Sequence, residues 1–430
     1  MSLPDVANGA PVPTTRRTPV QAASLAVFAV FFLSGFNFAS WASRLPAVRD
    51  GLSLSAGQIG LLLLVGAGGS VVALPLSGLV IERLGTRATV LWSAVLNASG
   101  LTVAAIGVGL QHVVVTAVGL IAYGVGTSVW DAAMNVEGAA VEQRVGRTVM
   151  PRYHAGFSFG TVAAAAVGAV AAALHVPVVV HLPVVLAVSI VAVVVSVRFF
   201  LPDEAASPHP HDEHVPRGGR GLLAAWLEPR TLLIGLVVLA AALTEGSAND
   251  WVGLAVVDGF DTGHALAAVT LGVFLASMTA MRWFGTHLLD RFGRVVVLRV
   301  CAVLALVGLS VFGLADQLWL AVLGVVAWGA GAALGFPVGM SAASDDPLRA
   351  ASRVAVVSTI GYTAFLAGPP LLGLLAQHVG YRNALLWILV PVALGMLVAG
   401  AAAPLPGRPR VDAATDAPAE GARVDGSDES

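Results

Sequence analysis

Twelve apolar runs, each about as long as a lipid bilayer is thick, constrain the fold of this chain more than any other feature. They lie near residues 20–41, 56–81, 88–110, 113–135, 153–174, 178–200, 230–257, 264–286, 295–314, 317–341, 353–377 and 381–403. A hydrocarbon core of about 30 Å requires roughly 20 residues of helix. The pattern therefore predicts an all-α membrane protein with twelve transmembrane helices.

The amino-acid composition supports a membrane protein and excludes several classes of enzyme. Hydrophobic residues make up 57% of the chain and charged residues 11%. All 23 basic residues are arginine, which excludes an ATP-hydrolysing P-loop and a Schiff-base lysine. Cys301 is the single cysteine, which excludes an internal disulfide and a cysteine-built metal site and favours a packing role. We expect no cofactor, and the formal charge of −2 gives no indication of nucleic-acid binding.

A short charged segment occurs twice, at residues 78–87 and 285–294, and each copy lies between two apolar runs. The two starts differ by 285 − 78 = 207 residues, near half the chain. The shared positions are Gly78, Glu82, Arg83, Gly85 and Arg87 in the first copy and Gly285, Asp290, Arg291, Gly293 and Arg294 in the second. A repeat at half-length predicts two pseudo-symmetric six-helix bundles. The glycines permit tight turns and the charges can pair with helix ends, so we expect a conformational role for these loops.

The rest of the chain divides around these bundles. We predict a disordered cytoplasmic tail at 1–19, bundles at 20–200 and 230–403, a polar connector at 201–229 and a second disordered tail at 404–430. The first run is long and lacks a clear cleavage site, so we prefer a retained helix to a signal peptide. Most arginines fall on one side of the predicted membrane, while Arg44, Arg49 and Arg382 fall clearly on the other. The positive-inside rule then places both termini in the cytoplasm.

The repeated loop resembles the signature loop of the major facilitator superfamily, which lies between spans 2 and 3 and again between spans 8 and 9. The resemblance implies a multi-pass transporter in a bacterial inner membrane, without enzymatic activity. It also implies a monomer in the lipid bilayer that moves a small-molecule solute by alternating access around a cavity between the bundles.

Polar residues within the spans are the candidates for binding solute and protons, because such groups are costly in lipid. Asn37 and Trp41 lie near the outer end of the first run, although Asn37 could join helices and Trp41 could be an interfacial anchor, as could Arg44. In the fourth run, Asp131 and Asn135 are four residues apart and share a helix face. That face suits a titrating carboxylate beside an amide that binds hydroxyls. The alternative is that Asp131 pairs with Arg144 or Arg152 at a helix end.

The stretch from Asp131 to Asn135 also resembles the acid-Thr-Ala-Ala-Asn stretch of the fucose and related sugar:proton symporters. In that family the carboxylate belongs to the sugar and proton site, which implies the same role for Asp131. Phe336-Pro337 is similar to a Phe-Pro pair in those symporters, whereas their carboxylate in span 1 is replaced here by Asn37. The chain also resembles an uncharacterised branch of bacterial inner-membrane facilitators that has A-M-N-x-x-G in span 4 and His-Ala-Gly at the start of span 5.

Glu245 is the deepest acid in the sequence, and Asn249 and Asp250 follow it on the same run. It lies fifteen residues beyond Arg230, about 22 Å along a helix. Subtracting 207 places it beside Asn37, so Glu245 could supply the carboxylate that the first span lacks. We therefore predict that Glu245 and Asp131 couple protons to transport, with Asn135, Asn37, Asn249 and Trp41 as further candidates.

Three weaker candidates remain. His154 could relay protons, although a histidine at a helix end is more often structural. Arg282 could extend to the headgroups. His209, His211 and His214 in the connector could bind a transition metal, but a solvated linker is the preferred interpretation.

These features favour a secondary transporter, proton-coupled, for a small polar, sugar-like solute. A proton-antiport exporter of drugs or secondary metabolites could use the same acids. A membrane sensor that keeps the fold without turnover is the alternative from another class.

Overall fold

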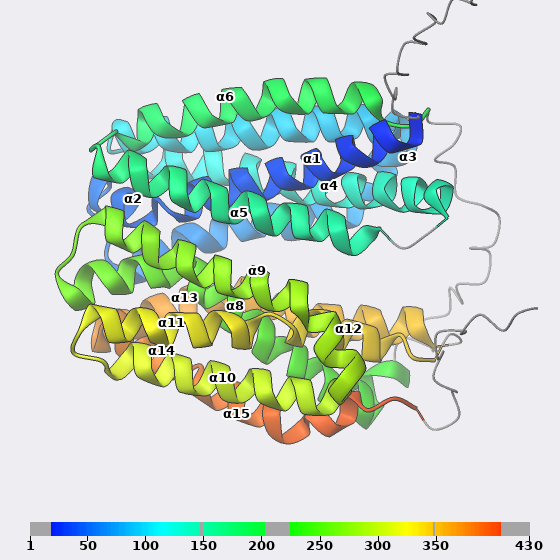
Figure 1. Cartoon of the computed structure of the whole chain (residues 1–430). Helices are drawn as coiled ribbons and strands as arrows, with labels where there is room; N and C mark the ends of the chain where they lie inside the picture. The colour runs from blue at the N-terminus through cyan, green and yellow to red at the C-terminus, as the bar shows by residue number, and fades with distance from the viewer. Residues whose placement is uncertain (1–18, 147–148, 203–223, 347–348, 406–430) are drawn as a thin grey trace, which may run out of the picture.

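The computed structural model describes residues 19–146, 149–202, 224–346 and 349–405, and all the regular elements assigned within these ranges are helices. Figure 1 shows them in two groups that lie side by side. The first group contains α1 (Pro19–Ala42), α2 (Leu45–Gly51), α3 (Ala56–Gly109), α4 (Val113–Val145), α5 (Met150–Ala173), α6 (Val178–Ser196) and the 3-10 helix η1 (Val197–Phe199). The second contains α8 (Pro229–Phe260), α9 (His264–Phe292), α10 (Arg294–Leu314), α11 (Leu318–Ala332), α12 (Gly335–Ala343), α13 (Ala350–Val379), α14 (Tyr381–Leu386), α15 (Leu389–Val398) and η4 (Ala399–Ala402).

The predicted tails and most of the predicted connector lie outside the described residues, as do His209, His211 and His214. Both described chain ends, Pro19 and Leu405, lie at the same face of the molecule, on the right in Figure 1. We call this the terminal face, and the other end of the helices the opposite face.

The long element α3 contains two predicted spans, joined at a kink. Eleven helical segments of the described chain are long and apolar enough to cross a membrane, and α3 alone has 54 residues. At 1.5 Å per residue it would measure about 81 Å, far more than one bilayer. Gly85 breaks it, with φ 75° and ψ 165°. Counting α3 as two spans gives 11 + 1 = 12, which confirms the predicted all-α fold with twelve transmembrane helices.

The glycine that breaks α3 has a counterpart in the second group. Gly293 separates α9 from α10 with φ 76° and ψ 162°, and 293 − 85 = 208 residues. A positive φ with such a ψ is essentially restricted to glycine. The two copies of the repeated loop therefore turn the chain in the same way, because each contains glycine at the turn.

Two spans are broken by proline. The predicted tenth span is divided into α11 and α12 just before Pro337, and the twelfth is divided into α14 and α15 just before Pro391. Proline lacks the N–H that would bond to the carbonyl four residues earlier. Those carbonyls belong to Ala333 and Trp387, which lie at the two breaks.

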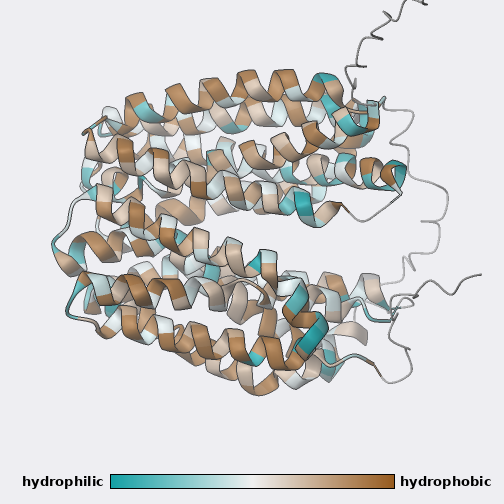
Figure 2. Cartoon of the chain, viewed as in Figure 1, coloured by the Kyte–Doolittle hydropathy of each residue, from teal (hydrophilic) through white to brown (hydrophobic). Residues whose placement is uncertain are grey.

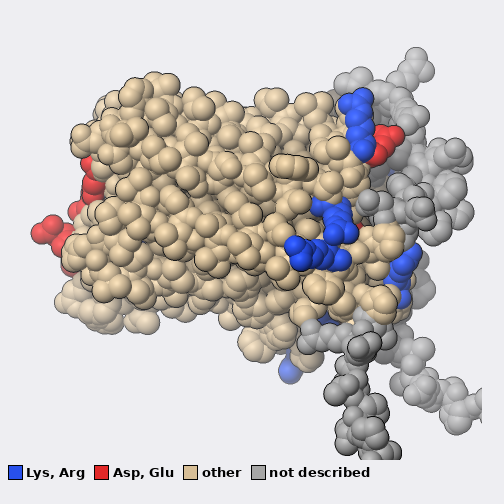
Figure 3. All heavy atoms as spheres, turned by 90° about the horizontal axis from the view of Figure 1, so that it is seen from above, with Lys and Arg blue, Asp and Glu red and all other residues tan. Residues whose placement is uncertain are grey.

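The surface is divided into an apolar belt and two polar ends. Figure 2 shows hydrophobic residues over the outward sides of both helical groups. In Figure 3, arginines gather toward the terminal face and acidic residues at the opposite face, with an uncharged belt between them. A belt of this kind fits the hydrocarbon core of a bilayer.

Candidate functional site

At the opposite face the two bundles pack together through glycines. A Cβ atom on Gly60 of α3 would lie 2.6 Å from the carbonyl oxygen of Pro369 in α13, and one on Gly373 of α13 would lie 2.6 Å from that of Ala56. No real Cβ atom fits at such distances. The absence of a side chain therefore lets α3 and α13 approach closely and seal this end of the interface.

Ion pairs reinforce the same seal. Arg49 of α2 donates from Nη1 to both carboxylate oxygens of Asp258 in α8, each at 2.7 Å. Its neighbour Asp50 pairs with Nε2 of His264 at the start of α9, at 2.8 Å. Burial lowers the pKa of Arg49, but hydrogen bonds to Tyr381, Asp258 and Asp50 outweigh it and raise that pKa above its ordinary value. We call Arg49, Asp50, Asp258 and His264 the opposite-face latch.

Toward the terminal face the bundles diverge, as the separation of α5 from α9 in Figure 1 shows. Polar side chains of spans 4, 5 and 11 remain accessible between the latch and this face. Asp131 and His154 are exposed, and Tyr362 of α13 is 47% exposed. The bundles are thus in close contact at the opposite face and diverge toward the terminal face.

An ionic contact inside the second bundle joins Glu245 to Arg282. Arg282 of α9 donates from Nη2 to Oε2 of Glu245 in α8 at 2.7 Å. The arginine side chain is 30% exposed and the glutamate side chain 18%. The expectation that Arg282 extends to the headgroups is therefore wrong, because a carboxylate within the same bundle offers a closer partner than the membrane surface.

The break in span 10 fixes the orientation of Arg282. Its Nε donates to the carbonyl oxygen of Ala333 at 3.1 Å. In an unbroken helix that oxygen would accept from the residue at position 337, which is Pro337 and has no N–H. Proline thus leaves a carbonyl free, Arg282 binds it through Nε, and its Nη2 donates to Glu245. This gives the Phe336-Pro337 pair a local structural role.

Asp131 and Asn135 form a second polar group on α4, facing the other bundle. The amide nitrogen of Asn135 donates to the Asp131 carbonyl at 2.8 Å and lies 3.4 Å from its carboxylate Oδ1. Among the described residues Asp131 forms no ion pair with Arg144 or Arg152, so the helix-end pairing considered above is absent. Asp131 interacts electrostatically with Tyr362 of the second bundle. Nothing in the sequence singles out Tyr362, because its relation to Asp131 depends on how the bundles dock.

The remaining candidates of spans 1 and 7 lie inside the bundles. Asn37 is 1% exposed and donates to Oδ1 of Asn97 at 3.0 Å, and Asn97 donates to Thr127 at 2.9 Å. This network fits the alternative in which Asn37 joins helices. Trp41 is 4% exposed and Asn249 is 8% exposed.

Three further polar residues, Arg44, Asp250 and His154, lie near these candidates in the sequence or the fold. Arg44 is 4% exposed and donates to the carbonyl of Val176 at 2.7 Å, and its burial lowers its pKa. Neither Trp41 nor Arg44 is an interfacial anchor. Asp250 lies within electrostatic range of Tyr123 in α4, so it faces the first bundle. His154 packs edge-on against Phe31 and lies within electrostatic range of Arg282.

The signature loops lie at the terminal face, where Glu82, Arg83, Asp290 and Arg291 are exposed. In each loop, the residue that directly follows Gly85 or Gly293 makes a contact with an acid, and the two contacts are equivalent in the repeat. Neither was predicted from the sequence. Thr86 donates to Oε2 of Glu137 at 2.6 Å, and Arg294 donates to Oδ1 of Asp345 at 2.8 Å.

A signal for these contacts was present in the chain. The offsets are 294 − 86 = 208 and 345 − 137 = 208 residues. Shifting every polar residue of the first bundle by the repeat offset, and not only those of the loops, would have identified both pairs. Thr86 thus links the loop after span 2 to an acid at the end of span 4, and Arg294 links the loop after span 8 to an acid at the end of span 10. Each bond fixes the position of the loop relative to that span.

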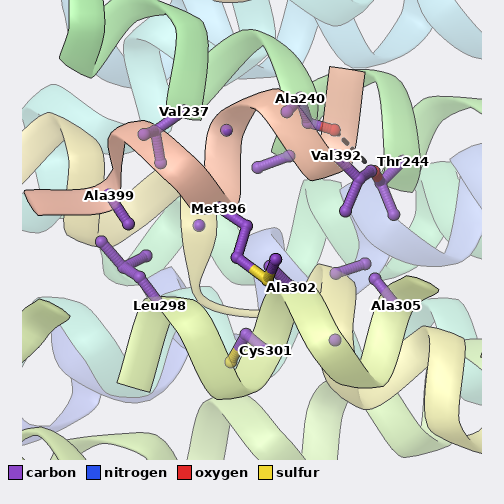
Figure 4. Close-up of a pocket in the computed structure, with 15 residues that line it drawn as sticks. Val237, Ala240, Thr244, Leu298, Cys301, Ala302, Ala305, Val392, Met396 and Ala399 are labelled. Carbon is purple, nitrogen blue, oxygen red and sulfur yellow. Dashed lines mark hydrogen bonds between the residues drawn. The ribbon is translucent and has the colours of Figure 1, made fainter. Parts of the chain in front are cut away.

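A small cavity inside the second bundle is a packing feature rather than a binding site. It has a volume of about 40 Å³ and lies between α8, α10, α11, α12 and α15 (Figure 4). Most of its lining is apolar, including Val237, Leu298 and Cys301, the last being 2% exposed. A space this small holds little more than a water molecule.

Comparison with known proteins establishes the class. Residues 27–354 and 284–425 match the Major Facilitator Superfamily. The chain is 32% identical over 376 residues to "Uncharacterized transporter y4wD" of Sinorhizobium fredii, which covers 85% of this chain and 97% of that protein. This chain belongs to the major facilitator superfamily and is a multi-pass membrane transporter.

Solved structures agree with this fold. The nucleoside transporter NupG superposes with a TM-score of 0.67 at 15% identity, covering 88% of this chain and 98% of that one. FucP in its outward conformation gives a TM-score of 0.61 at 14% identity, covering 90% and 100%. At these identities the likeness concerns the fold, and it confirms the resemblance noted from the sequence.

Proposed function

We propose that this protein is a proton-coupled secondary transporter that moves a small polar solute by alternating access. Its setting would be a bacterial inner membrane, with both termini in the cytoplasm and a monomer as the working unit. The terminal face is then cytoplasmic, and the structure corresponds to the state that is accessible from the cytoplasm.

The observation that carries the proposal is the Glu245–Arg282 pair. It lies within the spans, is partly exposed and belongs to a structure whose bundles are in close contact at the opposite face and diverge toward the terminal face. Ionisable groups in such positions commonly serve substrate or proton pathways. A proton that binds Glu245 changes the charge beside Arg282, so it can alter the relative stability of the two states.

A polyhydroxylated solute is supported by the second polar group and by the neighbours. Asp131 and Asn135 offer a carboxylate and an amide to hydroxyl groups from the side of α4. The structural neighbours include the E. coli fucose:proton symporter FucP and the nucleoside transporter NupG. Both names refer to solutes that carry several hydroxyl groups.

Purified protein in proteoliposomes with a trapped pH-sensitive dye tests the proposal. A panel of sugars, sugar acids and nucleosides is added outside, and the expected result is solute-dependent proton movement in the same direction as the solute. Proton movement against the solute would favour the exporter. Binding by thermal shift without flux of solute or protons would favour the sensor.

A further inference from the structure

The guanidinium of Arg282 is held in place but keeps capacity for another ligand. Its Nε binds the Ala333 carbonyl and its Nη2 binds Glu245, while 30% of the side chain remains exposed. Guanidinium groups bind carboxylates in a two-point geometry through paired N–H donors. Arg282 therefore keeps exposed donor capacity that an anion could use.

We propose that the transported solute carries a single anionic group, of carboxylate type, and that this group replaces Glu245 on Arg282 when Glu245 is protonated. The inference rests on the proposed function, since it names the class of solute that the same site would take. Arg282 then serves as the residue that selects for the anion.

Charge balance gives the reason for this exchange. Removing one partner of an ion pair within the spans carries a free-energy cost, because the other charge is left uncompensated. A neutral solute that displaced Glu245 would incur that cost. When a proton neutralises Glu245 and a carboxylate joins Arg282, the site begins and ends with no net charge. One proton and one anion therefore enter together.

Few other ionisable groups surround Glu245 and Arg282: on α8 itself the next acid is Asp250, which faces the first bundle. The helices α11, α12 and α15, which pack against α8, contain no ionisable residue. α13 contributes Tyr362, and α5 contributes His154 near Arg282. Asp131 faces Tyr362 from α4, where it can accept hydrogen bonds from hydroxyl groups of the same solute.

Matched pairs of acid and neutral compounds test the proposal by equilibrium binding to the purified protein. The probes are galacturonate with galactose, and gluconate with glucitol. We expect an acid to bind in preference to its neutral partner, and at least tenfold more tightly at pH 5.5 than at pH 8. In Glu245→Gln the acid should bind at pH 8 at least tenfold more tightly than in wild type, with little dependence on pH, because Arg282 no longer has an anionic partner.

The control variant is Asp316→Asn, an exposed acid in the loop before α11, which should keep the wild-type pH dependence. Arg282→Gln should lose the preference for the acid. If Arg282 only stabilises the broken span 10, Glu245→Gln will not increase acid binding at any pH, and the proposal is wrong. Preference for the neutral partners, or no binding of either acid, would also overturn it. Proton-coupled flux of a neutral solute in proteoliposomes would then leave the proposed function standing.

Discussion

Replacing Asp258 by asparagine should shift the protein toward a state that is open at the opposite face. The substitution removes the charge that receives two hydrogen bonds of 2.7 Å from Arg49. Hydrogen bonds to charged groups contribute about 1.5–3 kcal/mol when buried, but exposed pairs contribute about 1 kcal/mol or less. The Asp258 side chain is 45% exposed and that of Arg49 is 12% exposed. We therefore expect a loss of about 1 kcal/mol, which is about a fivefold change in the ratio of the two states.

Distance measurements between spin labels can detect a shift of that size. Labels on cysteines at His112 and Gln317, in loops of the first and second bundles at the opposite face, report their separation there. The native Cys301 is 2% exposed and can be replaced by alanine. Asp258→Asn should increase the long-distance population about fivefold. Asp261→Asn is the matched control, an exposed acid three residues further along that forms no ion pair with another described residue. Identical distance distributions for both variants and the wild type would refute the latch.

The signature loops and the end of α8 at the terminal face can be tested by melting temperature and by transport. Gly85→Ala and Gly293→Ala force alanine into a backbone conformation that only glycine adopts readily, at a cost of about 1–3 kcal/mol each. Each substitution should therefore lower the melting temperature. Gly78→Ala is the control and should not lower it, because a Cβ atom at that position would meet open space. Hydrogen bonds from Arg353 hold the pKa of Glu228 below its usual 4.5. Their stabilising effect is therefore present above pH 4.5 and is lost as the pH falls through the lowered pKa. The melting temperature of the wild type should then fall more steeply below pH 4.5 than that of Glu228→Gln. Asp290→Asn, at an exposed position of the terminal face, should change the transport rate more than solute affinity, and loss of binding by a folded variant would contradict a purely conformational role.

The transmembrane helices could be predicted from sequence because the bilayer fixes the length of an apolar run. The first run was expected at 20–41 and is Pro19–Ala42. The fourth was expected to end near 135, yet α4 continues to Val145, because a helix continues with polar residues where it leaves the lipid. The short helix α2, which supplies half of the latch, was not predicted, since its seven residues have no apolar run of membrane length.

The candidate site could be predicted only in part, because contacts between spans depend on how each helix is rotated. The acids at positions 131 and 245 stand out in any hydropathy pattern. The partner of Glu245, however, is Arg282, 37 residues away on another helix. Its orientation follows from the Ala333 carbonyl, which Pro337 leaves free at the break in a third span. An acid and an arginine that both lie within spans should have been considered as a pair, since lipid offers neither of them another partner.

Glu245 is the group that we propose couples protons to solute movement, and the Glu245→Gln variant in proteoliposomes tests this role most directly. Glutamine mimics the protonated carboxyl group but cannot release a proton. We predict that the variant exchanges solute across the membrane by counterflow but does not accumulate it when a pH gradient is imposed, whereas the wild type does both. Full uphill accumulation by the variant, with the wild-type dependence on the pH gradient, would remove Glu245 from the mechanism and leave Asp131 as the candidate for coupling.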